Sequence, residues 1–404
     1  MQKTELYKIF TTVILTIGFL MFSKALTNIG VGLVIIGLMI EVHKNKSDLF
    51  KSLKDMILDS KLYLFFVIGM LIWWMISALY GYNEIKSQHI VYNYLKWFGI
   101  VYIIAVIVKG AKILNEKYLV YTMHAVGVFI FFNLGYLVFI EGSKVPYAVG
   151  IGNPNATAAI LIMILPFLIF TNYLSGIYKK VSVFLTIVAL ILTGSRGGMI
   201  AFVILLIYGV VIYSKGKNII NLKIDLKKII SIILLFVCFF AVDSKMKIIS
   251  DFRGIGNICN QINSGEIRDE RLLLWKSSVE IIKDYPISGI GLGNFNDVYN
   301  KEGYILKKAR MPHLSSPHNI FLHLGVETGL IGAFLFISLV MYQLITSYIC
   351  RNKEQFIMAG HLAVLGMCIH GLVDYAFMGR GYYQMYWYIA TLMILEINRY
   401  RKYR

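Results

Sequence analysis

Leu62-Tyr-Leu-Phe-Phe-Val-Ile-Gly-Met-Leu-Ile-Trp-Trp-Met-Ile-Ser-Ala-Leu-Tyr-Gly81 is a run of twenty residues without a single charge in a chain of 404 residues. A helix needs about 20 apolar residues to cross the roughly 30 Å hydrocarbon core of a bilayer. The run is continuously apolar rather than alternating, which argues against a strand of a membrane barrel. It therefore predicts one membrane-spanning helix.

Similar runs recur along the whole chain, in which 58% of the residues are hydrophobic and only 15% are charged. Soluble domains typically contain about 25% charged residues. The first run is followed at once by a second, which favours a helical hairpin over a cleaved signal peptide. We therefore expect an all-α polytopic membrane protein with about twelve spans, near residues 9–23, 27–42, 62–81, 93–108, 118–140, 155–177, 181–195, 198–213, 229–242, 328–349, 356–376 and 382–398.

Basic residues are concentrated in alternate loops, as the positive-inside rule requires. With the N-terminus in the cytoplasm, the inner segments hold 23 of the 40 Lys and Arg residues. The short outer loops hold only Lys24, Lys86, Lys144, Arg196 and Arg380. We therefore expect an inner-membrane protein with both termini in the cytoplasm. Lysine-rich inner loops facing anionic lipid also account for the net charge of +18, so nucleic acid is not an expected partner.

One outer segment, residues 243–327, is long and precedes the last three spans. Loops of this length are uncommon unless they are functional. We expect residues 270–284 to form an amphipathic helix that lies on the bilayer surface or caps the bundle, and Tyr285-Pro286 to end it. The apolar residues predicted to share one face of this helix are Leu272, Trp275, Val279 and Ile282.

Gly289-Ile-Gly-Leu-Gly293 superficially resembles a phosphate-binding loop. No strand precedes it and no Lys-Ser or Lys-Thr pair follows, so a dinucleotide site is not expected. A tight turn that packs closely against its neighbours is the favoured interpretation.

Two arginines are candidate anion ligands. Thr193-Gly-Ser-Arg-Gly-Gly198 joins two short spans, so Arg196 is expected below the outer membrane surface, where an arginine is costly unless it is paired or lies in a cavity. The small residues around Arg196 leave room for a ligand, and the alternative is an arginine that reaches lipid phosphate. Arg271 begins the amphipathic helix. It is either an anion ligand or a solvated surface residue.

Several polar residues near the outer ends of spans are further candidates. His318-Asn319 leads into the tenth span, where the histidine could accept a proton or simply cap the helix. Asp374, four residues after His370, is either a functional group or a hydrogen-bonding tie between helices. Asn153 and Asn155, before the sixth span, are either a turn and helix cap or amides that face a polar substrate. The topology gathers these stretches and both arginines near the outer surface, which predicts a site there.

Four motifs in this order resemble the bacterial O-antigen ligase and O-antigen polymerase superfamily. They are Thr193-Gly-Ser-Arg-Gly-Gly198, Arg271-Leu-Leu-Leu-Trp275, Pro286-Ile-Ser-Gly-Ile-Gly-Leu-Gly-Asn-Phe295, and His318-Asn319 followed by Glu327-Thr-Gly-Leu-Ile-Gly332. The resemblance covers roughly residues 150–335, and the first 140 residues match only as generic membrane helices. It divides the chain into transmembrane helices one to five in residues 1–150 and a ligase-like catalytic region in residues 151–404.

The resemblance implies a GT-C-type membrane glycosyltransferase. Such proteins pass a glycan en bloc from undecaprenyl pyrophosphate to an acceptor hydroxyl at the outer face of the inner membrane. The acceptor of a ligase is lipid A–core, and that of a polymerase is another lipid-linked glycan. The family uses no metal and no cofactor. By motif, Arg196 and Arg271 look like the pyrophosphate-binding arginines and His318 like the acceptor-activating histidine. The expected substrate-binding residues are Asn153, Asn155, Asn319, Glu327 and Asp374.

The chemistry of these side chains agrees with that reaction. Arginine stays protonated and binds two phosphate oxygens at once, so two arginines can replace a divalent metal at a departing pyrophosphate. Between the two acceptors, the ligase reading is preferred. A flippase or transporter for the same lipid is the alternative from a different class. It would not need His318 beside the arginines, and it usually shows internal repeats, which we do not find in this sequence.

Overall fold

The computed structural model describes residues 3–21, 23–143, 147–148, 151–215, 270–301, 303–304, 316–376 and 382–402. Within these ranges the regular structure is entirely helical, which confirms the all-α class. The span predicted at 229–242 and the first part of the predicted outer segment, residues 243–269, lie outside the described residues.

A helix lies at every predicted span inside the described ranges. The N-terminal helices are α1 (Lys3–Leu20), α2 (Lys24–Asp59), α3 (Lys61–Leu79), α4 (Glu84–Gly110), α5 (Glu116–Gly135) with the π-helical turn η1 (Tyr136–Ile140), α6 (Pro154–Phe170), α7 (Gly176–Leu192) and α8 (Arg196–Lys215). The C-terminal helices are α11 (Glu270–Asp284), α12 (Phe295–Lys301), α13 (Ile320–Cys350), α14 (Gln355–Gly371) and α15 (Tyr382–Lys402).

Five of these helices are long and apolar enough to cross a membrane: α2, α3, α4, α5 continued by η1, and α13. Three shorter helical segments are also apolar: α6, the Arg196–Ile212 part of α8, and α14. The chain is thus a helical membrane protein, and the number of twelve spans stays a prediction. α6 is buried on nearly all faces, because it packs between α5, α7, α8 and α14. A helix that is apolar all round is stable only in such an enclosed position.

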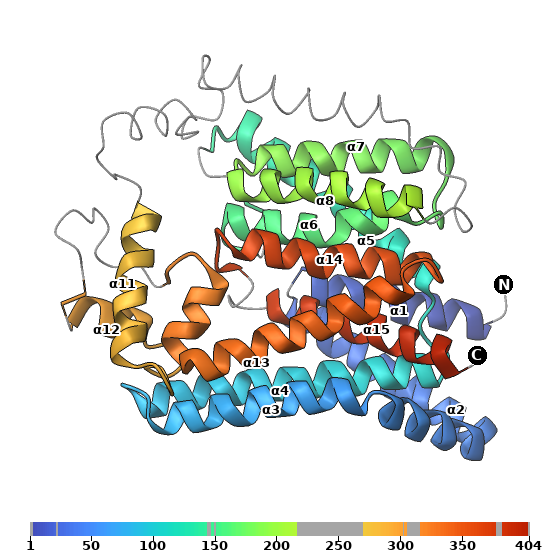
Figure 1. Ribbon diagram of the computed structural model, residues 1–404. Coiled ribbons are helices and arrows are strands. Elements are labelled where there is room, and N and C mark those ends of the chain that lie inside the picture. Colours follow the sequence, from blue (N-terminus) through green and yellow to red (C-terminus); the bar gives the residue numbers. More distant parts are fainter. Residues whose placement is uncertain are drawn as a thin grey trace.

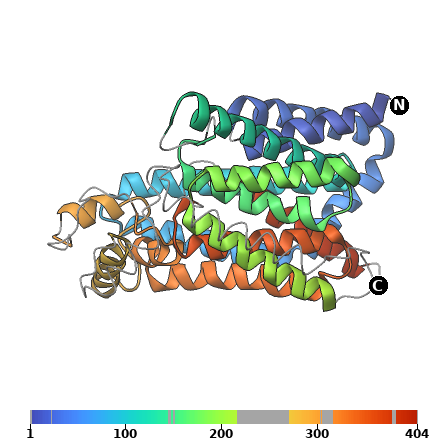
Figure 2. The same cartoon turned by 90° about the horizontal axis from the view of Figure 1, so that it is seen from above.

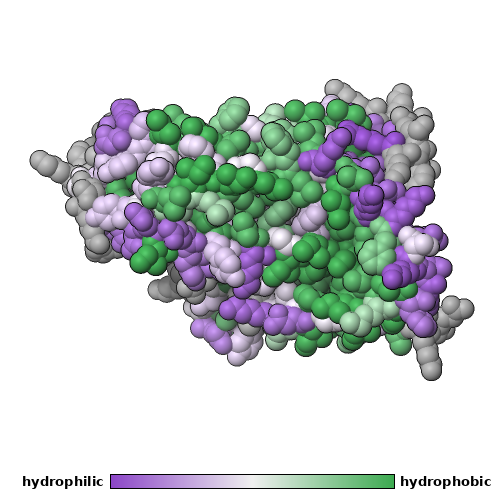
Figure 3. Space-filling view, turned by 90° about the horizontal axis from the view of Figure 1, so that it is seen from below, coloured by the Kyte–Doolittle hydropathy of each residue, from purple (hydrophilic) through white to green (hydrophobic). Residues whose placement is uncertain are grey.

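The helices form an elongated bundle with two distinct ends. Figures 1 and 2 show both chain termini at one end, with α11 and α12 at the other. In Figure 1, α11 stands across the end of α13, so this helix caps the bundle. The face shown in Figure 3 is mostly hydrophobic in its middle and hydrophilic toward the two ends. This distribution is what a membrane crossed along the long axis would produce.

The largest extensions beyond the predicted spans occur in three helices. α2 continues to Asp59 through a kink at Asn45, because Leu49 and Leu53 turn inward and pack on the bundle. α4 begins at Glu84, where the side chain of Asn83 caps it. α13 begins at Ile320, so the outer segment ends earlier than the predicted residue 327.

The face of α11 that packs also differs from the predicted one. Leu272 and Val279 are each 41% exposed, whereas Leu274 and Ile281 are buried against the α12 region. The predicted face of α11 is the one with more apolar residues. The contact is instead made by a face on which Ser278 allows close approach, since its hydroxyl is satisfied by the Leu274 carbonyl of the same helix.

α13 is broken at Gly329, whose φ of 69° lies in the left-handed region. The break leaves helix carbonyls without their usual N–H donors. The loop Gly289–Gly293 between α11 and α12, called here the glycine loop, supplies donors to them. Ile290 N donates to the Val326 carbonyl at 3.0 Å and Gly291 N to the Glu327 carbonyl at 2.8 Å. Trp73 of α3 donates its indole N–H to the Thr328 carbonyl at 2.9 Å. A broken helix is tolerated in a membrane protein when its backbone is satisfied in this way.

The glycine loop is therefore a close-packing turn, as the sequence favoured. Gly289, Gly291 and Gly293 all have positive φ. A Cβ atom on Gly289 would lie 2.4 Å from the Gly329 nitrogen, and one on Gly291 would lie 2.6 Å from the Cα of Gly81 in the α3–α4 turn. The spacing of these glycines thus serves the junction of α3, α4 and α13.

Candidate active site

Asp374 is the meeting point of the candidate residues. It lies in the turn beyond Gly371, the last residue of α14. Its Oδ1 accepts the backbone N–H groups of Tyr375 at 2.8 Å and Ala376 at 2.9 Å. Its Oδ2 accepts the side-chain amide of Asn155 at 2.6 Å, and His318 Nδ1 lies 3.6 Å from the same oxygen. The structure thus brings together three predicted site residues from α6, α14 and the start of α13.

The surroundings of Asp374 favour its charged form. Burial alone raises the pKa of this carboxyl, but the neighbouring imidazoles of His318 and His370 and the Ala376 amide outweigh the burial, so its pKa lies below the ordinary value for aspartate. A carboxylate that accepts several hydrogen bonds is held as an anion. Asp374 can therefore orient an imidazole without taking its proton.

His318 adopts an unusual backbone conformation. Its φ is 50°, in the left-handed region that costs a non-glycine residue roughly 1–2 kcal/mol. Its Nδ1 is buried without a hydrogen bond at normal distance, although the side chain as a whole is 32% exposed. The exposure therefore belongs to side-chain atoms other than Nδ1. Strained residues of this kind cluster at functional sites.

Two side chains fix the backbone on either side of His318. Asn319 caps α13 by accepting the N–H groups of Phe321 and Leu322, and it donates to the Leu372 carbonyl at 2.9 Å. Trp275 of α11 donates its indole N–H to the Pro317 carbonyl at 2.9 Å. Asn319 has both ends of its amide engaged within the protein, which gives it a positioning role in this structure.

The two arginines belong to helices that converge on the end of α14. Arg196 is the first residue of α8, and Gly197 packs so tightly there that a Cβ would lie 2.6 Å from Val373 Cγ2 and 3.8 Å from His370 Cδ2. Arg271 is in the first described turn of α11, and its positive charge acts on the His370 imidazole. Both arginines are half-buried. Cationic side chains next to helix N-termini favour an anionic ligand.

Two other predicted substrate-binding residues hold the fold in place. Asn153 is an exposed cap of α6, whose Oδ1 accepts the Ala156 N–H at 2.7 Å. Glu327 is only 2% exposed. Its Oε1 accepts the Phe295 N–H at the start of α12, and its Oε2 lies 2.9 Å from His323 Nε2. Glu327 therefore joins α12 to the broken part of α13 from inside the protein.

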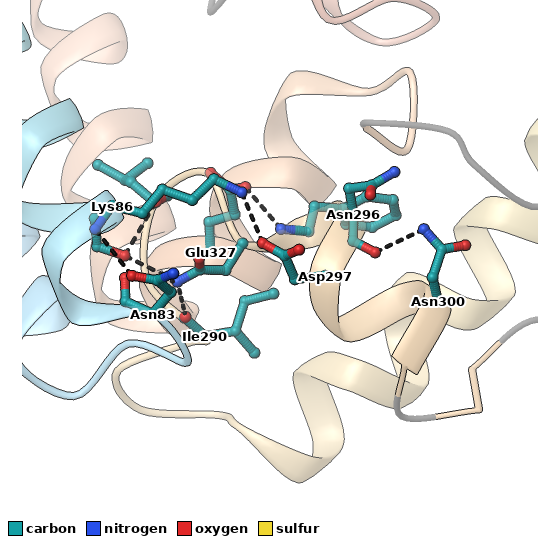
Figure 4. Close-up of polar contacts among 11 residues, drawn as sticks. Asn83, Lys86, Ile290, Asn296, Asp297, Asn300 and Glu327 are labelled. Carbon is teal, nitrogen blue, oxygen red and sulfur yellow. Dashed lines mark hydrogen bonds and ion pairs between the residues drawn. The ribbon is translucent and has the colours of Figure 1, made fainter.

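Figure 4 shows the polar contacts around α12 at this end of the molecule. Lys86 of α4 forms an ion pair with Asp297 of α12 at 2.7 Å. Asn300 donates to the Asn296 carbonyl at 2.7 Å within the helix. The α12 helix is thus attached to α4 as well as to α13. Because α11 packs against the α12 region, these contacts also hold α11 beside the His318 turn.

Sequence reasoning missed two supports of the site. Trp275 was predicted as an apolar face residue, although its position in the same motif as Arg271 could have indicated a link to the site. The His323 ring lies 4.0 Å from the Tyr375 ring, and Tyr375 follows Asp374 directly. The spacing of His323 and Glu327, one helical turn apart, was the available signal for that buried pair.

The geometry suits one kind of chemistry. An anionic carboxylate beside Nδ1 stabilises the imidazole with its proton on that nitrogen, which leaves Nε2 as the proton acceptor. Nearby cationic helix starts suit an anionic leaving group. The fold is that of a helical membrane protein, and its bundle end opposite the termini carries a histidine–carboxylate pair with arginines on neighbouring helices.

Residues 181–337 match the family model described as O-Antigen ligase. The match supports the O-antigen ligase superfamily for this part of the chain, in agreement with the resemblance seen in the motifs. The match includes Arg196, Arg271, His318 and Glu327, whereas Asn153, Asn155 and Asp374 lie outside it.

A protein of Haemophilus influenzae, described as uncharacterized, is 23% identical over 218 residues. The similarity covers 53% of this chain and 52% of that protein. The chain thus spans about half of the length of the relative it matches.

Proposed function

We propose that this protein is a membrane glycosyltransferase of the O-antigen ligase type. It transfers a glycan from undecaprenyl pyrophosphate to an acceptor hydroxyl at the outer face of the inner membrane, with lipid A–core as the acceptor. The observation that carries the proposal is the 3.6 Å approach of His318 Nδ1 to the Asp374 carboxylate, at the bundle end where the helices of both arginines converge.

In the proposed step, His318 Nε2 removes the proton of the acceptor hydroxyl. The hydroxyl oxygen forms a bond to the anomeric carbon of the donor glycan. The bond from that carbon to the pyrophosphate oxygen breaks, and undecaprenyl pyrophosphate leaves with the electron pair. Asp374 stabilises the resulting imidazolium, while Arg196 and Arg271 bind the pyrophosphate as its charge grows.

The charge of the two bundle ends supports an outward orientation of the site. The inner segments by charge include Lys109, and this lysine pairs with Glu396 near the C-terminal end of α15 at 2.6 Å. α11 lies at the opposite end of the bundle, and its Trp275 is hydrogen-bonded to Pro317, the residue before His318. With the lysine-rich end in the cytoplasm, the proposed site faces outward, where a glycan-carrying lipid and its acceptor are both exposed.

The proposal is tested with purified full-length protein in proteoliposomes. The donor is an undecaprenyl-pyrophosphate-linked glycan from the same bacterium, and the acceptors are lipid A–core in one arm and a second lipid-linked glycan in the other. We expect a new glycosidic bond with lipid A–core and no loss of rate in a chelator. Product only with the second lipid-linked glycan would make the protein a polymerase. Movement of the donor lipid across the bilayer without bond formation would make it a flippase and end the transferase proposal.

A further inference from the structure

Among the described residues, Asn155 makes the closest side-chain contact to Asp374. Its Nδ2 lies 2.6 Å from Asp374 Oδ2, whereas His318 Nδ1 lies 3.6 Å from that same oxygen. The other oxygen, Oδ1, is already held by the two backbone amides of its own turn. Rotation of the carboxylate is therefore blocked on one side by the turn and on the other by Asn155.

The position of Asn155 is itself tightly defined. It follows Pro154, the first residue of α6, whose ring presets the backbone angle for a helix start. Asn153 caps the same helix end. α6 packs along α14, the helix that leads into the Asp374 turn. The amide of Asn155 is thus delivered to the carboxylate by a rigid helix end, whose N-terminal dipole also favours a negative charge there.

We propose that Asn155 is a positioning residue that aims Asp374 Oδ2 at His318, rather than a residue that binds the glycan. The inference rests on the proposed function. An amide donor at this distance occupies one lone pair of Oδ2 and leaves the other directed to the imidazole. Asp374 then keeps its charge and its direction while the proton of the acceptor passes to Nε2. Among the described residues, the charged or titratable groups that act on this cluster are His318, His370 and Arg271. Arg196 precedes Gly197, which packs against Val373 and His370.

Two substitutions test whether Asn155 orients the Asp374 carboxylate or only stabilises the fold. Asn155→Leu removes the donor at all pH values, and we expect the transfer rate to fall about 10- to 100-fold, since a small misplacement of a reacting group can cost about 100-fold. Asn155→Asp has almost the same shape but places a second carboxylate against Asp374. Two adjacent carboxylates share a proton at low pH and repel each other at high pH. The rate of Asn155→Asp relative to wild type should therefore rise by about tenfold as the pH falls from 8.5 to 6.

The control is Asn115→Asp. Asn115 caps α5 at the opposite end of the bundle, where its Oδ1 accepts the Lys117 N–H at 3.1 Å. The same chemical change there should leave the ratio to wild type constant with pH. All variants are measured as full-length protein in proteoliposomes with the undecaprenyl-pyrophosphate-linked donor and the acceptor that supports wild-type transfer.

A rate for Asn155→Leu near that of wild type, or a pH-independent ratio for Asn155→Asp, would overturn the inference. If Asn155→Leu does not fold, the isosteric Asn155→Asp alone decides the question. His318→Ala in the same assay distinguishes failure of the proposed general base from failure of the positioning role of Asn155. Retained transfer in His318→Ala removes the proposed general base. Loss of transfer in His318→Ala, together with a pH-independent ratio of Asn155→Asp to wild type, removes only the role of Asn155.

Discussion

Trp275 is tied to Pro317, the residue before His318, by a hydrogen bond of 2.9 Å from its indole nitrogen to the proline carbonyl. The same helix carries Arg271 one turn earlier. One helix therefore supplies a cationic group and also holds the histidine turn in its left-handed conformation. Movement of α11 would displace both groups together, which makes this helix the mechanical link between the proposed anion site and the proposed base.

Trp275→Phe tests that link, because it keeps the ring and removes the N–H. We expect the transfer rate to fall about tenfold or more through misplacement of His318. Trp73→Phe is the matched control, since Trp73 makes an indole hydrogen bond of equal length to the Thr328 carbonyl at the α13 break. It should lower thermal stability, at a cost of about 1–3 kcal/mol for the unsatisfied buried carbonyl, without lowering the rate per folded molecule. Equal rates for the two variants would contradict the link.

The glycine loop makes a prediction about stability. Gly289 and Gly176 both have a φ of 67°, but only Gly289 lacks space for a Cβ, which would lie 2.4 Å from the Gly329 nitrogen. Gly176→Ala should cost roughly 1–2 kcal/mol for the left-handed backbone alone. Gly289→Ala should cost about 1–3 kcal/mol more, because the α13 junction must open. Thermal unfolding of both variants in detergent measures the difference, and equal midpoints would show that the junction is not tight.

The proposed anion site predicts that charge alone is insufficient. Arg196→Lys and Arg271→Lys keep a positive charge but lose the planar fork that binds two phosphate oxygens. We expect each variant to bind the undecaprenyl-pyrophosphate-linked donor about tenfold more weakly and to transfer it more slowly. Lys283→Gln, an exposed change near the far end of α11, serves as the control. Wild-type donor affinity in both lysine variants would exclude the arginines as pyrophosphate ligands.

The orientation of the bundle is tested by cysteine labelling in a variant without the native cysteines. Ile287, which follows α11, is 64% exposed, and Lys112 lies in the exposed turn between α4 and α5. Ile287→Cys should react with an impermeant maleimide on intact spheroplasts, whereas Lys112→Cys should react only after permeabilisation. The reverse pattern would place the candidate site in the cytoplasm.

Much of the fold could be predicted because membrane helices are marked by composition. The run from Leu62 to Gly81 is nearly coextensive with α3. The errors arose where packing outweighs local hydropathy. The second part of α2 is charged, yet Leu49 is buried, and the start of α13 is polar because His323 and Glu327 pair inside the protein. Neither arrangement can be read from the chain without knowing its neighbours.

The candidate site was predictable only in part, for a similar reason. Residue types suited to proton transfer and anion binding identified His318, Asp374 and the two arginines as candidates. Which residue contacts which depends on three-dimensional distances. Asn155 and Asp374 are hydrogen-bonded although 219 residues separate them, and Glu327, expected at a substrate, lies inside the fold.

The most direct test of the central claim is the reaction of His318→Ala with prebound donor. A general base contributes about 10² to 10⁴ in rate, whereas it need not contribute to donor affinity. We therefore predict that His318→Ala binds the undecaprenyl-pyrophosphate-linked donor as tightly as wild type, while single-turnover transfer to the acceptor falls by about 10² or more. Transfer at the wild-type rate in His318→Ala would contradict the assignment of His318 as the base and, with it, the proposed mechanism.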